Sequence, residues 1–541
     1  MSRAGSGVPF CVSKKSGYAG LFRQELKRCL RPGTQTPRPP GKAGQYDFIL
    51  EGLRALQASR NEYFDSLRGA AFAVPFSNAE SYAIMRPPTK EEDGSMRIRI
   101  TNVLLMPGVT NEAHIPFIPD AEVLVDGSRI AYAGPRCEAP SFEADEVIDG
   151  EGMLAMPGLC NMHTHTPMTL LRSIGSDLTL DRWLNEAIFP VEKHLTDEAV
   201  RAGSDLGIME MLRFGTTSFN DMYMHMDMEA EAVRDSGMRA LLGHGVVDFD
   251  ESCADLAPNI ALIEKWNHAA DDRIRVSLAP HSEGATTEKL LLKVREAAET
   301  YHVPIHIHVS ETKLDFDGSL QRRGLTPPQY LEKLGLMEHS MLAAHCVWVT
   351  DEDIELLARR GVTVLHNPIS NLKLASGIAP VARMLKAGCR ITLGTDGVAS
   401  NNNLNLWEEI KLMPMLQKGN TLDPTVVSPA QTIAAATSAG AKAMGYEYLG
   451  LLRPGYLADL ILLDLSGAHM CPCNDLESNL VYSAQGSDVA LTMVNGKVLY
   501  RDGEYTTLDP RLVLERAKKQ AEALLDRAAR AARAARAAAA K

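Results

Sequence analysis

The chain has 541 residues, which exceeds the usual size of one domain, so one large domain with smaller attachments is expected. Hydrophobic residues make up 45% of the sequence, and no apolar run is long enough to cross a bilayer. The formal net charge of -12 argues against a nucleic-acid-binding surface. The nine cysteines follow no disulfide-framework spacing, which suits a reducing compartment. Neither a membrane nor a nucleic acid is therefore an expected partner.

The N-terminal part of the chain differs from the rest in composition. Within residues 1–44, nine lysines and arginines face a single acid, Glu25. Such a basic, acid-poor stretch is typical of an organelle transit peptide, and it fits a disordered extension of a cytosolic enzyme equally well. Helical spacing of apolar residues then predicts an accessory helix over about 45–67. We assign residues 1–95 to an N-terminal extension and expect a cytoplasmic location, with import into an organelle as the alternative.

Two stretches of short alternating strands flank the centre of the sequence. The pattern of strands and turns runs through residues 96–155 and returns in residues 446–508. Because both flanks share this pattern, we expect one small β-sandwich domain assembled from both ends of the chain. The remaining residues, 509–541, end in Arg-Ala-Ala repeats, and their alanine-rich composition predicts a helical tail.

Strand-like and helix-like runs alternate through residues 156–445. After the apolar run that precedes His163, further strand candidates span 216–221, 239–246, 274–280, 304–309, 341–346, 362–366 and 390–395. Helical patterns separate them, for example over 196–213, 288–301 and 351–359. This rhythm predicts an α/β fold with a TIM-like (β/α)8 barrel, in which the active site lies at the C-terminal ends of the strands.

Several metal-binding side chains stand at the ends of these predicted strands. His163 and His165 are two residues apart, so on a strand both imidazoles lie on one face and can grip one divalent metal. His308 and Asp396, at the ends of later strands, are expected to complete the ligand set. Three histidines and one aspartate suit Zn²⁺, and Fe²⁺ accepts the same ligands. Residues 277–281 contain no lysine to bridge two metals, so one metal ion is expected.

Further side chains near these ends suit acid–base chemistry. Glu311 follows His308 by three residues, and we expect it to move protons between a metal-activated water and a substrate nitrogen. His345 is expected to contact the attacking water, and Asp396 to accept a proton from it. His306 shares a strand face with His308 but lies further from the barrel mouth, so we expect it to fill the layer beneath.

At these residues the sequence resembles the amidohydrolase superfamily. Within it, the resemblance is to the 5-methylthioadenosine/S-adenosylhomocysteine deaminases and to the related aminohydrolase and chlorohydrolase branch, from about residue 98 to about residue 508. The motifs that carry it are Met156-Pro157-Gly158, His163-Thr164-His165, Pro167-Met168-Thr169-Leu170-Leu171-Arg172, Trp183-Leu184, Gly237-Met238-Arg239, Ala344-His345-Cys346, His366-Asn367-Pro368-Ile369-Ser370-Asn371-Leu372-Lys373-Leu374 and Leu393-Gly394-Thr395-Asp396-Gly397. The resemblance implies a metal-dependent hydrolase barrel and carries the ligand role onto His163, His165, His308 and Asp396.

The resemblance also implies contacts with a small-molecule substrate, with Glu192 holding the ribose hydroxyls. The contact residues would be Trp183, Glu192, His281, Glu311 and Asp396. Where family members often carry an arginine that meets the homocysteine carboxylate, this chain has His244, and no arginine occurs from Asp248 to Asn259. Because a guanidinium is the natural partner of a carboxylate, this departure favours substrates with an uncharged 5′ group. Family members are often oligomeric, so the resemblance also points to a homo-oligomer.

The resemblance implies hydrolytic conversion of the 6-amino group of an adenosine-like nucleoside, of the 5′-methylthioadenosine or S-adenosylhomocysteine type, to the 6-oxo form with release of ammonia. A second hypothesis keeps a deaminase or chlorohydrolase but changes the ring to guanine, a pterin, cytosine or a triazine. Glu192 separates the two, because a free base has no ribose for it to hold. A third hypothesis is a non-catalytic barrel used for binding or assembly. The intact ligand positions and Glu311 disfavour it.

Overall fold

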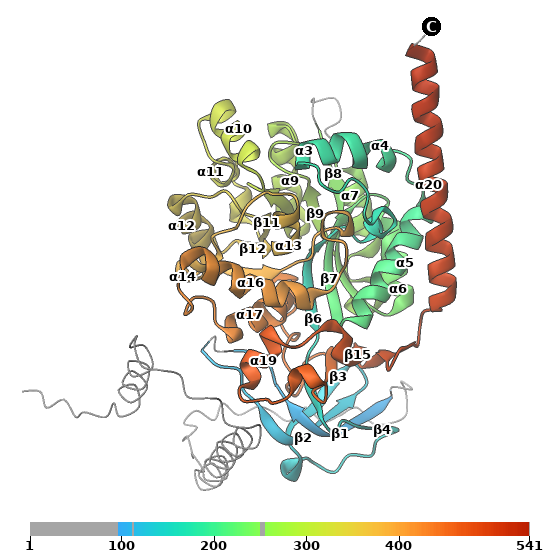
Figure 1. Cartoon of the computed structure of the whole chain (residues 1–541), viewed down its shortest axis with the longest axis vertical. Coiled ribbons are helices and arrows are strands. Elements are labelled where there is room, and N and C mark those ends of the chain that lie inside the picture. The colour runs from blue at the N-terminus through green and yellow to red at the C-terminus, as the bar shows by residue number, and fades with distance from the viewer. Residues whose placement is uncertain (1–95, 111–112, 249–254, 540–541) are drawn as a thin grey trace, which may run out of the picture. The chain divides into compact units, whose positions relative to one another are not determined.

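The centre of the chain forms a parallel barrel whose strands follow one another in sequence order. The computed structural model describes residues 96–110, 113–248 and 255–539. Within them, eight strands pair side by side from β6 to β13 (Figure 1). Their bounds are β6 (Leu159–Thr164), β7 (Thr216–Tyr223), β8 (Arg239–Val246), β9 (Ile274–Pro280), β10 (Ile305–Val309), β11 (Met341–His345), β12 (Thr363–His366) and β13 (Arg390–Leu393). Beyond β13, Asp396 N donates to His163 O at 2.8 Å and brings the last strand back to the first. The predicted (β/α)8 barrel is confirmed.

The barrel strands are buried on both faces, which explains why they read as nearly continuous apolar runs. In β10 the alternation of side chains is visible. Ile305, Ile307 and Val309 join the large apolar core, whereas His306 and His308 point to the opposite face. The observed strand bounds agree with the predicted ones to within two residues.

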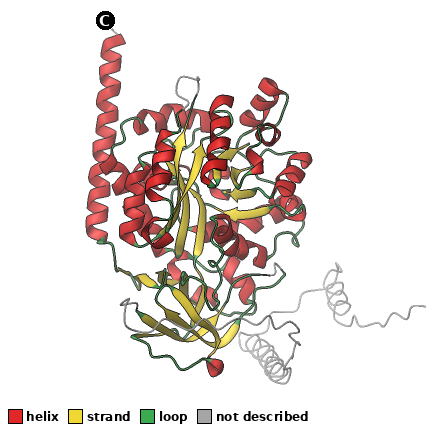
Figure 2. Cartoon of the chain, turned by 180° about the vertical axis from the view of Figure 1, so that it is seen from behind, coloured by secondary structure: helices red, strands yellow, loops and turns green. Residues whose placement is uncertain are grey.

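Helices surround the barrel strands (Figure 2). Threonines fix several of their N-termini: Thr196 accepts from Ala199 N at the start of α5, and Thr350 forms a capping box with Asp353 at the start of α12. The longer helices are α5 (Asp197–Arg213), α6 (Met226–Ser236), α7 (Ala257–Trp266), α9 (Glu288–Tyr301), α10 (Lys313–Arg323), α11 (Pro327–Lys333), α12 (Asp351–Arg360), α16 (Leu406–Thr421) and α17 (Pro429–Ala436). The shorter ones include α3 (Leu180–Arg182), a π-helical turn (Trp183–Ile188), α4 (Phe189–Glu192), α13 (Pro368–Lys373), α14 (Val381–Lys386), α15 (Val398–Asn401), α18 (Ser438–Ala443) and α19 (Leu476–Tyr482).

A second, mixed sheet combines the two flanks of the sequence. In the described part of the chain it holds nine strands, in the order β17-β16-β15-β14-β5-β1-β2-β3, with β4 paired to β1. Their bounds are β1 (Arg97–Leu105), β2 (Ile118–Asp126), β3 (Arg129–Pro135), β4 (Glu146–Asp149), β5 (Met153–Pro157), β14 (Leu460–Asp464), β15 (Val489–Val494), β16 (Lys497–Arg501) and β17 (Glu504–Tyr505). The antiparallel pairing of β5 with β14, with Ala155 opposite Leu462, joins the early flank to the late one. The expected assembly of a small β domain from both flanks is confirmed.

A buried ion pair ties the barrel to this sheet. Arg239, at the start of β8, donates through Nε to Asp459 Oδ2 at 2.8 Å and through Nη2 to Asp459 Oδ1 at 3.1 Å. The two side chains are 0% and 1% exposed. Asn495 N donates to the same carboxylate at 2.8 Å, and the ring of Tyr446 lies 4.8 Å from the guanidinium. Both charges are therefore fully paired in a bidentate arrangement.

The tail forms helix α20 (Pro510–Ala539), as its composition predicts, and the helix lies along α5 (Figure 1). Leu524 is fully buried there, and Arg527 Nε donates to His194 O at 3.1 Å. None of the helices that the structure describes is long and apolar enough to span a membrane. The accessory helix predicted over about 45–67 and the basic stretch 1–44 lie outside the described residues.

Candidate metal and active site

The C-terminal ends of β6 and β10 bring three of the predicted metal ligands together. His163 on β6, His165 directly after β6 and His308 on β10 each offer a ring nitrogen, and these atoms lie within 4.8 Å of one another. His163 is fully buried, and its Nε2 has no hydrogen-bond partner among the described residues. A buried polar nitrogen without a partner is rare in proteins, so this atom indicates a missing ligand.

Asp396 and His345 form a second group with His163, and one metal ligand atom from each again lies within 4.8 Å of the others. Asp396 Oδ1 is 3.3 Å from His165 Nε2 and 3.6 Å from His163 Nε2. Two ligands of one tetrahedral zinc ion are about 3.4 Å apart when each bond is about 2.1 Å long. The spacing of these atoms therefore fits a single small divalent cation.

Two of these histidines are oriented by backbone carbonyls. His165 Nδ1 donates to Met222 O at 2.6 Å, and His308 Nδ1 donates to His281 O at 2.7 Å. Because a carbonyl oxygen only accepts, the proton of each neutral ring sits on Nδ1 and the lone pair on Nε2. A hydrogen bond from the ring nitrogen that does not bind the metal is typical of metal-binding histidines.

Burial keeps several of the clustered imidazoles neutral. It lowers the pKa of His163 and His308 well below the usual value, and neighbouring histidines lower both further. The pKa of His281 falls to about 4, again because of burial first and of His165 and His345 second. The neutral imidazole is the form that binds metal, so burial keeps these rings in the form that a metal ion requires.

Close approach of β13 to β6 positions Asp396. A side chain at Gly394 would place its Cβ 2.6 Å from His163 N, so only glycine allows the two strand ends to meet. Asp396 itself has a φ of 62°, a conformation that L residues rarely adopt. Ser370 Oγ donates to its Oδ2 and Gly397 N to its Oδ1, both at 2.6 Å. These contacts hold the carboxylate against the histidines.

Glu311 lies beside this group and just past the end of β10. Its Oε2 is 3.8 Å from His345 Nε2, and Ser376 Oγ donates to its Oε1 at 3.1 Å. Only 8% of the residue is exposed. Burial raises the pKa of Glu311, the nearby carboxylate of Asp396 raises it further, and His345 opposes the rise. A buried carboxyl group of raised pKa beside an imidazole suits a group that takes up and releases protons during a reaction.

His345 is held by the segment that follows β12. Its backbone has a φ of 74° at the end of β11, and its Nδ1 donates to Asn371 Oδ1 at 2.8 Å. Its Nε2 is buried without a hydrogen-bond partner in the described residues and faces Glu311 and Asp396. The predicted acid–base residues therefore meet at one point beside the candidate metal ligands.

Two predicted substrate contacts, Glu192 and Trp183, lie between β6 and α5 and have different surroundings. Glu192, at the end of α4, accepts from Tyr223 Oη at 2.5 Å, and Tyr223 in turn lies near the ring of His165 at 6.3 Å between centroids. Glu192 thus reaches the rim of the cluster. Trp183 is 6% exposed and donates through Nε1 to Ile174 O at 3.2 Å, so its polar atom is held by the loop that precedes it.

His281 and His244 stand at the ends of β9 and β8. The ring of His281 stacks on His308 with centroids 4.5 Å apart, which places it against the cluster. His244 is partly buried, and burial lowers its pKa, with His225 lowering it further and Asp227 raising it. Burial therefore favours the neutral form of His244.

Sequence reasoning missed the residues that support the cluster. Ser370 and Asn371 hold Asp396 and His345, yet within the recognised motif 366–374 no role could be assigned to either. Asp221 was also missed: it is fully buried at the end of β7 and accepts from Thr166 N at 2.6 Å. Local sequence carries no signal for such contacts, because each joins segments distant in the chain.

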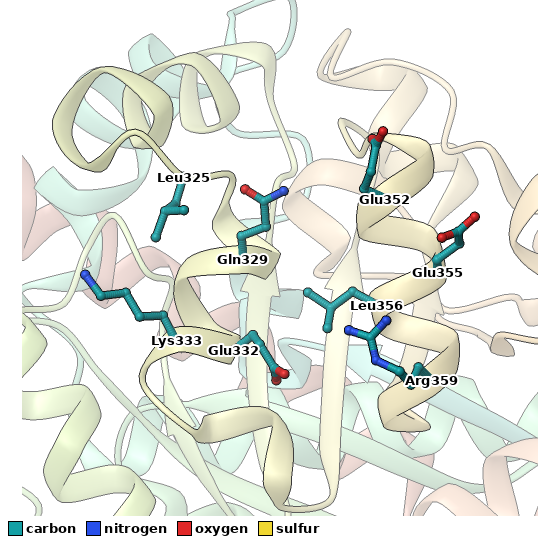
Figure 3. A pocket seen from close by; sticks show the side chains of 8 residues that line it. All are labelled: Leu325, Gln329, Glu332, Lys333, Glu352, Glu355, Leu356 and Arg359. Carbon is teal, nitrogen blue, oxygen red and sulfur yellow. The ribbon is translucent and has the colours of Figure 1, made fainter.

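A separate groove of about 460 Å³ lies between α11 and α12 on the outside of the barrel (Figure 3). Its lining mixes acidic, basic and apolar side chains, namely Leu325, Gln329, Glu332, Lys333, Glu352, Glu355, Leu356 and Arg359. Glu332 is already paired with Arg360 at 2.6 Å. The two groupings of possible metal ligands in the described residues lie elsewhere, at His163, His165, His308, His345 and Asp396.

Comparison with known proteins agrees with this site. The model of the amidohydrolase family matches residues 154–499. A 5′-deoxyadenosine deaminase of Methanosarcina barkeri is 46% identical over 76% of this chain and 95% of its own length. A 5-methylthioadenosine/S-adenosylhomocysteine deaminase of Moorella thermoacetica is 45% identical over 75% of this chain and 95% of its own length. The zinc-bound crystal structure of an adenosine deaminase from Xanthomonas campestris superposes with a TM-score of 0.75 at 33% identity, covering 79% of this chain and 98% of that one.

Fold and site together define a barrel hydrolase with a cluster of histidine and aspartate ligands suited to a metal ion. The chain belongs to the amidohydrolase family. It is an enzyme that hydrolyses carbon–nitrogen bonds other than peptide bonds, of the deaminase type, as the sequence predicted.

Proposed function

We propose that the chain removes the 6-amino group of an adenosine-type nucleoside with an uncharged 5′ group, using one divalent metal ion. The observation that carries the proposal is the meeting of His163, His165, His308 and Asp396 with the buried acid Glu311. Neutral ring nitrogens aimed at one point, beside a carboxyl group of raised pKa, are what hydrolytic deamination requires.

In this proposal His163, His165, His308 and Asp396 hold the metal. Zn²⁺ is the preferred ion because the set combines nitrogen and oxygen donors at tetrahedral spacing, and Fe²⁺ accepts the same donors. The structure of the Xanthomonas campestris relative was solved with bound zinc, which supports this preference. Bound there, the ion supplies a water whose pKa is lowered toward about 7.

Glu311 is proposed to carry protons. It takes one proton from the attacking water and gives it to a ring nitrogen, while the water oxygen bonds to the carbon that bears the amino group. The second proton of the water passes to the amino nitrogen, with Asp396 as its acceptor on the way. The carbon–nitrogen bond then breaks, ammonia leaves, and the ring keeps a 6-oxo group. The buried position of Glu311 and its hydrogen bond from Ser376 support this role.

His345 and His281 are proposed to orient the reacting groups. His345 Nε2 faces the carboxylates of Glu311 and Asp396, so it is placed to hydrogen-bond the oxygen that adds to the ring. His281 stacks on His308 and presents its own ring at the rim, where it can contact a purine nitrogen. The apolar part of the Trp183 indole is proposed to contact the substrate.

Glu192 is proposed to bind the ribose. Its carboxylate is oriented by Tyr223 Oη at 2.5 Å, within reach of the rim near His165. A carboxylate held in this way matches the paired hydroxyls of a ribose, and a free nucleobase has no group for it to hold. Relatives named for 5′-deoxyadenosine and 5-methylthioadenosine, both nucleosides, support this reading.

The proposed preference for substrates with an uncharged 5′ group rests on His244. An imidazole whose pKa is lowered by burial is a weaker counter-charge for a homocysteine carboxylate than a guanidinium, and it can pack against a methyl or methylthio group. The 46% identical relative named for 5′-deoxyadenosine agrees with this choice.

The test is ammonia release by purified protein whose metal content has been measured. The panel comprises 5′-deoxyadenosine, 5′-methylthioadenosine, adenosine, S-adenosylhomocysteine, guanine and a pterin. The proposal expects turnover of the first three at higher kcat/KM than S-adenosylhomocysteine, and none of the free bases. Turnover of guanine or the pterin alone would keep the chemistry and overturn the nucleoside assignment.

A further inference from the structure

His163 is oriented differently from the two predicted ligands that share its neighbourhood. His165 and His308 each give their Nδ1 proton to a backbone carbonyl, which fixes the tautomer without help from any side chain. In the described residues, the partner of His163 Nδ1 is instead the Nε2 of His306, at 2.9 Å. A ring nitrogen either donates or accepts, so this contact alone leaves the tautomer of His163 open.

Asn220 removes that ambiguity. Its Nδ2 donates to the carbonyl oxygen of Met162 at 2.8 Å, which identifies this end of the amide as the NH₂ group. The same Nδ2 lies 3.4 Å from His306 Nε2. Because an N–H group faces it, Nε2 must carry the lone pair, and it then accepts the Nδ1 proton of His163. In the opposite tautomer two N–H groups would face each other, and His163 Nε2 would carry the proton that excludes a metal.

This arrangement leaves a buried polar atom without a partner. His306 is 0% exposed, and the proton that its Nε2 lacks must sit on Nδ1, for which the described residues offer no acceptor. A residue selected only to fill the barrel would be an apolar one of similar size, because an unpaired buried N–H destabilises the fold. An unpaired group retained in a core indicates a functional reason for its presence.

We propose that Asn220 and His306 are positioning residues that form a relay, in which Asn220 sets the tautomer of His306 and His306 sets that of His163, so that His163 Nε2 is free to bind the metal. The inference rests on the proposed ligand role of His163. His306 therefore does more than fill the layer beneath the site, which is all that its place in the strand indicates.

The first experiment measures Zn²⁺ affinity by competition with a chromophoric chelator, in the full chain. His306→Leu removes the acceptor, and we expect a fall of about tenfold to a hundredfold, the usual effect of losing such a second contact. His306→Gln returns an amide oxygen near the position of Nε2 and is expected to recover part of the loss. His366→Leu is the matched control, since His366 is also buried with unpartnered ring nitrogens but has no hydrogen bond to a predicted ligand.

Two further readouts separate positioning from folding. The metal-free His306→Leu protein should unfold at about the same temperature as the parent, because the unpaired N–H of His306 is lost while the N–H of His163 loses its acceptor. The visible absorption of the Co²⁺-loaded protein should change in band position or intensity, because one imidazole binds differently. In a double-mutant cycle, Asn220→Leu should weaken Zn²⁺ binding in the parent and leave it unchanged in His306→Leu.

Equal Zn²⁺ affinity and an unchanged Co²⁺ spectrum in His306→Leu would overturn the relay, as would independent, additive effects of the two substitutions. Should His306→Leu fail to fold, Asn220→Leu with His306→Gln carries the same test. If the parent chain binds no Zn²⁺ or Co²⁺ at all, the proposed metal site itself fails, and that result is distinct from the failure of the relay alone.

Discussion

Two buried polar regions lie at opposite ends of the barrel strands and differ in whether their polar atoms have hydrogen-bond partners. The joint between the barrel and the mixed sheet pairs Arg239 with Asp459 through two hydrogen bonds, and neighbouring groups satisfy the remaining atoms. At the opposite ends of the strands, His163 Nε2 and His345 Nε2 are buried without partners in the described part of the chain. Both regions bear the desolvation penalty of buried polar groups, but only the cluster leaves ring nitrogens without an internal hydrogen bond.

This difference indicates that the polar groups of the joint stabilise the fold, whereas those of the cluster bind a ligand or take part in a reaction. A bidentate ion pair whose polar atoms are all hydrogen-bonded holds two elements together and has no group left to bind a ligand. A set of ring nitrogens and a carboxylate that converge on one point is stabilised by binding a cation there. The contrast predicts that substitutions at the joint change stability and spare chemistry, whereas substitutions at the cluster do the reverse.

The largest effect is expected from loss of a proposed ligand. His163→Ala should lower kcat/KM for 5′-deoxyadenosine at least about a thousandfold, because the metal contributes several kcal/mol to the reaction. Zinc content measured after dialysis should fall in parallel, and thermal unfolding of the metal-free protein should change little. A variant that keeps both zinc and activity would remove His163 from the ligand set.

The next effect concerns the proposed proton carrier. Glu311→Gln keeps size and hydrogen-bonding atoms but cannot carry a proton, so kcat should fall by about 10²- to 10⁴-fold. Bound zinc should stay at the parent level, since Glu311 is not a proposed ligand. Steady-state kinetics with metal analysis checks this. Ser376→Ala, which removes the hydrogen bond to Glu311, is the milder companion and should reduce kcat by a smaller factor.

The joint gives the opposite pattern. Asp459→Leu leaves the buried guanidinium of Arg239 without its partner, so the free energy of unfolding should fall by about 3–5 kcal/mol. Denaturant unfolding measures it, and kcat per folded molecule should match the parent. The double variant with Arg239→Met should recover most of the lost stability, because no unpaired charge remains. Equal destabilisation in the single and double variants would mean that the pair acts through packing instead of charge.

The smallest effects are expected at the proposed ribose contact. Glu192→Ala should lower kcat/KM for nucleosides about tenfold to a hundredfold, since hydrogen bonds to a charged group contribute about 1.5–3 kcal/mol. Tyr223→Phe, which only frees the carboxylate, should lower it less than tenfold. Kinetics with 5′-deoxyadenosine measures both. Unchanged turnover in Glu192→Ala would contradict the nucleoside assignment and favour a free base.

The barrel and the cluster were predictable because both depend on regular patterns. Buried parallel strands read as apolar runs, and parallel strands in a barrel bring all their C-terminal ends to one mouth. Once eight such runs are placed, the segments that carry His163, His308, His345 and Asp396 are expected at the same mouth of the barrel. Strand alternation placed His306 and His308 on one face, and the position of His308 nearer the strand end favoured it as the ligand.

The supporting contacts were not predictable from sequence. The Nδ1 partners of His165 and His308 are backbone carbonyls, which every residue carries, so no residue type marks them. The positive φ angles of His345 and Asp396 turn both side chains into the cluster at positions where the strand pattern ends. The role of Asn220 likewise depends on its spatial neighbours Met162 and His306, which come from other segments of the chain.

The most direct test of the central claim is ammonia release from 5′-deoxyadenosine as a function of Zn²⁺ bound per chain. Metal-free protein is titrated with Zn²⁺, and rate and bound metal are measured on the same samples. The account predicts negligible activity without metal and a linear rise that saturates at one ion per chain. Full activity in metal-free protein, or saturation only at two ions, would contradict a single metal held by His163, His165, His308 and Asp396.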